Sequence, residues 1–222
     1  MMWSVVTPSA SASKFRISRW RKDAAATTVE DMRRTAVNIG CTGRNSQSYQ
    51  SPAMLKNLGG FKFNIICGYP GSVESVFALT KGEVDLVSSA WNSWRATHRD
   101  EIAAGTFIPV IQVGLRRATE LPNVPLMQEL VSNERHKTLI EFASAGSAIG
   151  RALIAPPQVP ADRLAALRQA FDKVVRDPDF IADADRARAE LDPTPGAEVQ
   201  KVTQTILKAP QDVIDESSKA ME

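Results

Sequence analysis

The stretch from Phe63 to Val87 decides the fold, and it reads FNIICGYPGSVESVFALTKGEVDLV. The apolar run at residues 65–67 is typical of a strand, the Gly-Tyr-Pro-Gly that follows is typical of a turn, and a second apolar run closes the stretch. Between the two runs, Val73, Val76 and Phe77 recur at helical spacing, which predicts a helix that lays this face on a sheet. The order strand, helix, strand predicts a βαβ unit and hence a parallel sheet.

A similar unit precedes this one. Residues 37–41 form an apolar strand pattern, a polar segment runs to Tyr49, and Ser51-Pro52 is expected to open a helix. The loops after the two strands, 42–49 and 68–72, should meet at the carboxyl edge of the sheet, where helices present unpaired N–H groups. This arrangement favours an anion site. The alternative is that the Thr, Ser and Asn side chains only form turns and helix caps, and the residues alone leave both interpretations open.

The rest of the chain reads as further strands and helices. Alternation at residues 14–20 and an apolar run at 108–113 predict strands, and Pro160 begins a strong amphipathic helix that carries Leu164, Leu167 and Phe171 on one face. Residues 88–94 read as a polar loop whose tryptophans either line a cleft or pack in the core. The small residues 143–150 read as a hinge.

Composition excludes several classes of protein. A chain of 222 residues with 43% hydrophobic content and a net charge of +2 can bury a core in one or two domains, and its charge is too small to favour nucleic acid as a partner. The apolar run 102–115 is too short and broken to span a bilayer. Residues 1–12 lack a secretory signal pattern, so the chain as written is expected to stay in the cytoplasm.

No catalytic, metal or cofactor site is predicted. The two cysteines, Cys41 and Cys67, are too few for a metal site and are expected to be reduced and buried, although both end predicted strands and could approach if those strands are neighbours. His98 and His136 lie near no candidate nucleophile, and Ser72 lacks the Gly-x-Ser-x-Gly pattern of a nucleophile elbow.

Several motifs resemble, in the same order, the substrate-binding receptors of tripartite tricarboxylate transporters, the Bug or TctC-like proteins. They cover the chain from about residue 15 onward. The motifs are Thr28-Val-Glu-Asp31, Val37-Asn-Ile-Gly-Cys-Thr-Gly43, Gly68-Tyr-Pro-Gly-Ser72, Lys81-Gly-Glu-Val-Asp85, Leu121-Pro-Asn-Val-Pro125, and Gly150-Arg151 through Ala155-Pro-Pro157 to Val159-Pro-Ala-Asp-Arg163.

The resemblance implies a type II periplasmic-binding-protein fold of two α/β lobes and a periplasmic, non-enzymatic receptor. Such a receptor binds a small carboxylate and delivers it to a membrane permease. Arg44 stands where the family commonly has proline, and it either adds a charge-assisted contact to a carboxylate or faces solvent. By position, the ligand-binding residues would be Thr42, Gly43, Ser46, Ser48 and Tyr49 in one loop, and Tyr69, Gly71 and Ser72 in the other.

The resemblance also predicts the division of the chain. Residues 1–23 would be an N-terminal segment with a crossover strand, 24–147 a nearly complete second lobe, and 148–222 the C-terminal helical part of the first lobe. The chain would then be an N-terminally truncated receptor, with apolar helix faces left uncovered and weak or no carboxylate binding on its own. The other hypotheses are a small α/β enzyme acting on a carboxylated or phosphorylated substrate, and a degenerate fragment without function.

Overall fold

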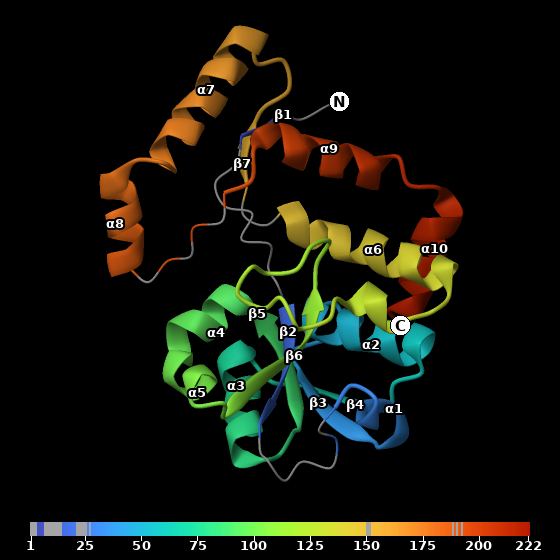
Figure 1. The fold of residues 1–222 in the computed structure, drawn as a ribbon. Helices are drawn as coiled ribbons and strands as arrows, with labels where there is room; N and C mark the ends of the chain where they lie inside the picture. The colour runs from blue at the N-terminus through green and yellow to red at the C-terminus, as the bar shows by residue number, and fades with distance from the viewer. Residues whose placement is uncertain are drawn as a thin grey trace. The chain divides into compact units, whose positions relative to one another are not determined.

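The structure is a computed structural model that describes residues 4–6, 15–20, 26, 28–149, 152–187, 189, 191 and 193–222. The chain forms two compact units (Figure 1). The larger unit comprises residues 14–144 and 210–222, and the smaller comprises residues 1–13 and 145–209.

The larger unit is built on a five-stranded mixed sheet with the order β4-β3-β5-β2-β6. Its strands are β2 (Phe15–Trp20), β3 (Val37–Cys41), β4 (Phe63–Cys67), β5 (Leu86–Ala90) and β6 (Phe107–Val113). β3 is parallel to both of its neighbours, which confirms the predicted βαβ crossover from β4 to β5. β2 is antiparallel to β5 and β6.

Helices cover both faces of this sheet (Figure 1). One core, centred on Ile39, Leu55 and Phe63, lies under α2, α6 and α10, and a second, centred on Leu79 and Trp94, lies under α3, α4 and α5. The helical elements of this unit are α1 (Asp31–Arg34), α2 (Gln47–Gly59), α3 (Ser72–Lys81), α4 (Trp91–Thr97), α5 (Arg99–Ala103), the 3-10 helix η1 (Met127–Leu130), α6 (Glu134–Ile149) and α10 (Gln211–Ala220).

The buried face of α3 matches the predicted one at Val76, which is buried, and differs from it at Val73 and Phe77. Val73 is 75% exposed and Phe77 is 59% exposed, whereas Ala78 and Leu79 are buried with the small Ser75. Small side chains at 75 and 78 allow the helix backbone to approach the sheet, so this stripe, rather than the one with the larger side chains, faces the core. The result is an apolar stripe on the outer side of α3.

The predicted hinge at residues 143–150 is helical through Ile149, because α6 continues to that residue. Alanine is the strongest helix former, and Ala143, Ala145 and Ala148 outweigh the glycine and serines between them. Gly150 and Arg151 of the motif discussed above lie outside the described residues.

The smaller unit contains β1 (Ser4–Val6), which pairs antiparallel with β7 (Leu153–Ala155), and the helices α7 (Ala161–Val174), α8 (Pro178–Arg186) and α9 (Gly196–Leu207). α7 buries none of its residues fully: Leu164 and Phe171 are half-buried, and Leu167 is 49% exposed. The amphipathic helix therefore forms as predicted, and much of its apolar face is open to solvent.

The two units divide the chain differently from the domains proposed above. β2 joins the sheet of the larger unit, and α10 also belongs to this unit, although residues 210–222 were assigned to the other lobe. The boundary near Ser144 falls inside α6. The proposed boundary between residues 23 and 24 lies outside the described part of the chain.

Polar contacts fasten α10 to the larger unit. Asn57 Nδ2 donates to the Ala220 carbonyl at 3.1 Å, and the Arg135 guanidinium binds the carboxylate of Glu216 through Nη2 at 2.9 Å and Nε at 3.1 Å. The same guanidinium donates to Asp212. These hydrogen bonds hold the pKa values of Asp212 and Glu216 below their usual range.

This cluster predicts a pH dependence of stability. A carboxyl group whose pKa is lower in the folded state stabilises it above the unfolded pKa, and this contribution is lost as the pH falls through the folded pKa. We therefore expect wild type to melt at a higher temperature than Arg135→Gln at neutral pH, and the difference to vanish in acid. Thermal unfolding of both proteins across this pH range tests the prediction, and a difference that persists in acid would contradict it.

Candidate functional site

The carboxyl ends of β4, β3 and β5 lie side by side at one edge of the sheet. Cys41 and Cys67 end β3 and β4 in register, with Cα atoms 4.4 Å apart, and form a disulfide. The prediction of two reduced cysteines is therefore wrong, because the parallel pairing of the two strands brings the side chains within bonding reach. The Cys41 carbonyl also accepts from the Gly68 N–H at 3.2 Å, so both candidate loops leave the sheet from the same point.

The first loop is shorter than predicted. Ser46 precedes the first residue of α2, and Ser48 and Tyr49 lie in the first turn of the helix, while Pro52 lies within it rather than at its start. Proline at this position leaves the Ser48 carbonyl without its helical N–H donor, and its ring crowds that carbonyl.

Three hydroxyls of the first loop form a cluster. Ser48 Oγ lies 2.6 Å from Ser46 Oγ and 3.2 Å from Thr42 Oγ1, and it accepts from the Thr42 N–H at 3.2 Å. Ser46 Oγ also donates to the Gly43 carbonyl at 2.6 Å. The structure thus brings together four of the predicted residues, in a network that closes the loop on itself.

Tyr49 is directed elsewhere. Its hydroxyl donates to the Glu222 carbonyl at 2.6 Å, beyond the end of α10. The Arg44 guanidinium lies over the Tyr49 ring, 5.6 Å from its centroid, and the Arg44 side chain is exposed. The positive charge of Arg44 therefore lies over Tyr49 and is exposed to solvent, a position that sequence reasoning left undecided.

The second loop leads into the N-terminus of α3. Gly68 has a φ of 120°, a conformation that favours glycine, and Gly71 precedes the helix with Ser72 exposed as its first residue. The Glu74 carboxylate bends back over this end: its Oε2 lies 2.8 Å from where a side chain on Gly71 would begin. A negative charge of the chain itself therefore already lies near the positive end of the helix dipole.

Tyr69 contributes to the core beneath the loop. Its ring packs against the second core, and a side chain on Gly40 would begin 3.3 Å from it. Burial, and secondly the charge of Glu83, raise the pKa of the Tyr69 hydroxyl. Among the three predicted residues of the second loop, Ser72 is thus the one with an exposed polar side chain at the carboxyl edge of the sheet.

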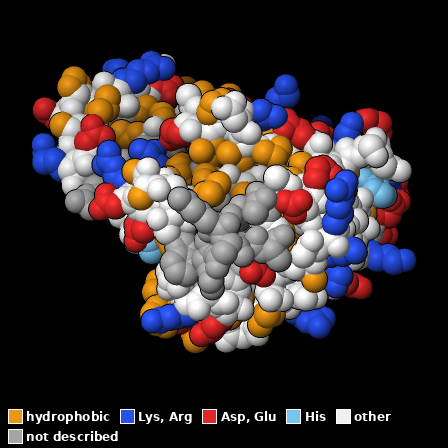
Figure 2. Space-filling model, turned by 60° about the horizontal axis from the view of Figure 1, so that its bottom comes forward, with side chains coloured by type: hydrophobic (Ala, Val, Ile, Leu, Met, Phe, Trp, Pro, Cys, Tyr) orange, Lys and Arg blue, Asp and Glu red, His pale blue; other side chains and the backbone are white. Residues whose placement is uncertain are grey.

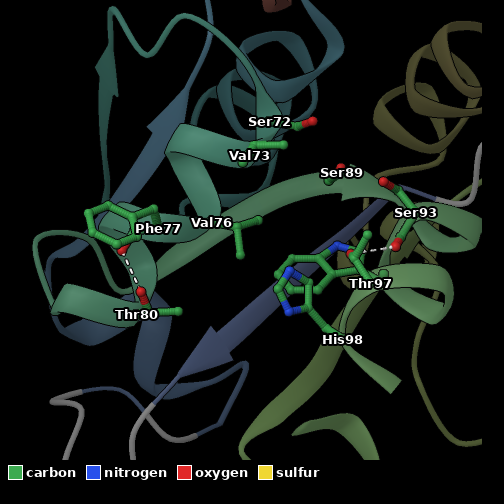
Figure 3. Close-up of a pocket in the computed structure, with 10 residues that line it drawn as sticks. Ser72, Val73, Val76, Phe77, Thr80, Ser89, Ser93, Thr97 and His98 are labelled. Carbon is green, nitrogen blue, oxygen red and sulfur yellow. Dashed lines mark hydrogen bonds between the residues drawn. The ribbon is translucent and has the colours of Figure 1, made fainter. Parts of the chain in front are cut away.

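The segment at the end of β5 is not the polar loop that was predicted for residues 88–94. β5 continues to Ala90 and α4 starts directly at Trp91, and both Trp91 and Trp94 are buried in the second core, in line with the packing alternative. Beside them, a cavity of about 290 Å³ lies between α3 and α4 (Figure 3). Its lining is Ser72, Val73, Val76, Phe77 and Thr80 from α3, Ser89 from β5, and Ser93, Trp94, Thr97 and His98 from α4 and the residue that follows it. The cavity was missed because it depends on how α3 is rotated.

The face drawn in Figure 2 carries no extended patch of side chains with one sign of charge. Among the side chains coloured there, Lys and Arg are interspersed with Asp and Glu. In the described part of the chain, no group of three or more His, Cys, Asp and Glu side chains is placed to hold a metal ion. No helix among the described residues is long and apolar enough to cross a membrane.

Comparison with solved structures identifies the fold. The structure matches a TctC solute-binding protein from Polaromonas with a TM-score of 0.65 and 16% identity, over 97% of this chain and 68% of that one. It matches an R. palustris protein solved with adipate with a TM-score of 0.58 and 15% identity, over 100% and 69%. It matches MatC from Rhodopseudomonas palustris, solved with malate, with a TM-score of 0.56 and 17% identity, over 99% and 70%.

The periplasmic binding protein BugD matches with a TM-score of 0.55 and 18% identity, over 99% of this chain and 68% of that one. The chain thus has the α/β fold of these solute-binding proteins over about two-thirds of their length, as the resemblance predicted. The sequence matches no protein-family model and no curated protein.

Proposed function

We propose that the protein is a solute-binding receptor of the TctC and Bug type, which binds a small carboxylate outside the cytoplasm and delivers it to a membrane permease. The observation that carries this proposal is the fold, shared with a TctC protein over 97% of the chain. Two of the matched structures were solved with carboxylates, adipate and malate. The proposal includes the eight residues of the two loops as candidates, with Arg44 added.

The chemistry of the carboxyl edge supports an anionic ligand. Thr42 and Ser46 carry half-buried hydroxyls, Ser48 is buried, and α2 and α3 begin at this edge with unpaired N–H groups, which suit carboxylate oxygens. Arg44 supplies a charge that is not held in any described ion pair. The Cys41–Cys67 disulfide supports an oxidising compartment such as the periplasm.

The proposal is tested by titrating the protein with adipate, malate and succinate in a calorimeter. We expect at least one to bind, and Arg44→Gln to weaken it by about tenfold, the equivalent of about 1.4 kcal/mol for a charge-assisted contact. Arg34→Gln is the matched control, because Arg34 is also exposed but precedes β3, at the opposite edge of the sheet.

Equal losses in the two variants would indicate a general effect of net charge and would remove Arg44 from the site. Absence of binding by all three acids, in protein that unfolds cooperatively, would contradict the proposed ligand class. Glu74→Gln provides a further check: removing the competing carboxylate at the α3 N-terminus should strengthen binding.

A further inference from the structure

The cavity between α3 and α4 has an apolar wall. Val76 of α3 faces Thr97 and His98 across it, Phe77 lies farther out beside Thr80, and Ser89 of β5 completes the lining (Figure 3). The exposed stripe of α3 described above, Val73 and Phe77, belongs to this wall. The exposure of these two large apolar side chains is thus confined to the rim of a concave site, which is where a ligand would cover them.

The three serines of the cavity gather at one end, whereas Thr80, Thr97 and His98 add polar groups elsewhere in its lining. Ser72, Ser89 and Ser93 lie together at the carboxyl edge of the sheet, whereas Phe77 and Thr80 lie at the other end (Figure 3). The serine end adjoins the N-terminus of α3, the same edge that carries the candidate anion site. A ligand that fits this cavity therefore has one polar end and one apolar end.

Trp94 adds an independent observation. It lines the cavity and is 1% exposed, and its Nε1–H has no hydrogen-bond acceptor among the described residues. Edge-to-face packing on Phe107, with ring centroids 5.1 Å apart, fixes the indole. A buried donor without an acceptor is costly, so the wall formed by Trp94 carries an unsatisfied polar group that reports on whatever enters the cavity.

The cavity does not suit a second charge. Among the ten described residues that line it, none is Lys, Arg, Asp or Glu, and the imidazole of His98 already faces Glu101, with Nδ1 3.5 Å from Oε1. A carboxylate buried there without a partner would be strongly unfavourable. Its volume of about 290 Å³ lies at the small end of ligand pockets, which span about 300–1,000 Å³, so it accommodates one ring or a short branched chain.

We propose that this cavity binds the uncharged apolar body of a monocarboxylate, an aryl or branched alkyl group, while the carboxylate lies at the serine end. The inference rests on the proposed function and narrows its ligand to an acid with one charged end. Dicarboxylates such as adipate would use the carboxyl edge without entering the cavity.

The test is calorimetric titration with phenylacetate and with acetate, which shares the carboxylate but lacks the ring. Burying a phenyl group should make phenylacetate bind about 10- to 100-fold more tightly than acetate. Thr97→Trp fills the cavity from an exposed position on α4 and should remove this advantage. Ala96→Trp is the matched control, since Ala96 is its exposed neighbour outside the lining.

A second measurement, by NMR, monitors the Trp94 indole directly. Phenylacetate should shift the NMR resonance of the Trp94 Nε1–H, which Trp94→Phe identifies by its loss. An unchanged resonance, or equal phenylacetate affinity in Thr97→Trp and Ala96→Trp, would overturn the inference. If the cavity inference failed in this way but adipate still bound in an Arg44-dependent manner, the proposed receptor function would stand without the cavity inference. If no acid bound, the receptor function and the cavity inference would both be contradicted.

Discussion

Replacing Cys41 and Cys67 together by alanine is expected to lower the free energy of unfolding by about 3.5 kcal/mol, the chain-entropy estimate for a loop closed across 26 residues. The disulfide stabilises mainly by restricting the unfolded chain. It also joins the two strands where the candidate loops begin, so its loss should loosen both loops. Urea unfolding of the wild type and the double variant measures the effect.

A reducing agent supplies the control. Dithiothreitol should lower the urea midpoint of the wild type toward that of the double variant and leave the double variant unchanged. Titration of free thiols in the unfolded, unreduced wild type should find none. Two titratable thiols there, or a midpoint that does not respond to dithiothreitol, would show that the cysteines are not bonded.

A comparably large loss is expected for Gln112→Leu. Gln112 is 1% exposed, and its amide serves the connector after β6: Nε2 donates to the Leu121 carbonyl at 3.0 Å and to the Val124 carbonyl at 2.7 Å. Its Oε1 accepts from the buried Ala118 N–H at 2.8 Å. Leucine has a similar size but leaves all three backbone groups without this partner, so we expect a cost of about 2–5 kcal/mol by chemical denaturation.

Gln128→Leu is the matched comparison. Gln128 is also buried, yet its Nε2 makes one hydrogen bond, to the Gly114 carbonyl at 3.0 Å, and its Oε1 has no partner among the described residues. The same substitution there removes one bond and one unsatisfied oxygen, so we expect a change of about 1 kcal/mol or less. Similar losses at the two positions would mean that volume, rather than hydrogen bonding, decides the outcome.

Local patterns predicted most elements of the fold. β3 is the predicted strand 37–41, and β6 begins one residue before the predicted 108. α7 begins at Ala161, directly after the Pro160 that was expected to begin this helix, because proline fixes where a helix can start. These elements are specified by residues adjacent in sequence, so the pattern of one sequence is enough to predict them.

The features that sequence reasoning missed depend on contacts between distant residues. The buried face of α3 is decided by the close approach that Ser75 and Ala78 permit, and the disulfide by the register of β3 against β4. The structure brings the hydroxyls of Thr42, Ser46 and Ser48 together, whereas the turn of Tyr49 toward Glu222 required the position of α10. No spacing within the sequence encodes these relations.

The return of α10 to the larger unit bears on how the protein is made. During synthesis, residues 145–209 leave the ribosome after the sheet and before the helix that packs on α2 and meets Arg135. The emerging sheet domain therefore stays incomplete, with Val213 and Ala220 absent from its core, until translation has passed the whole of the smaller unit. Such a chain gains its full cooperativity only after its last residues have been synthesised.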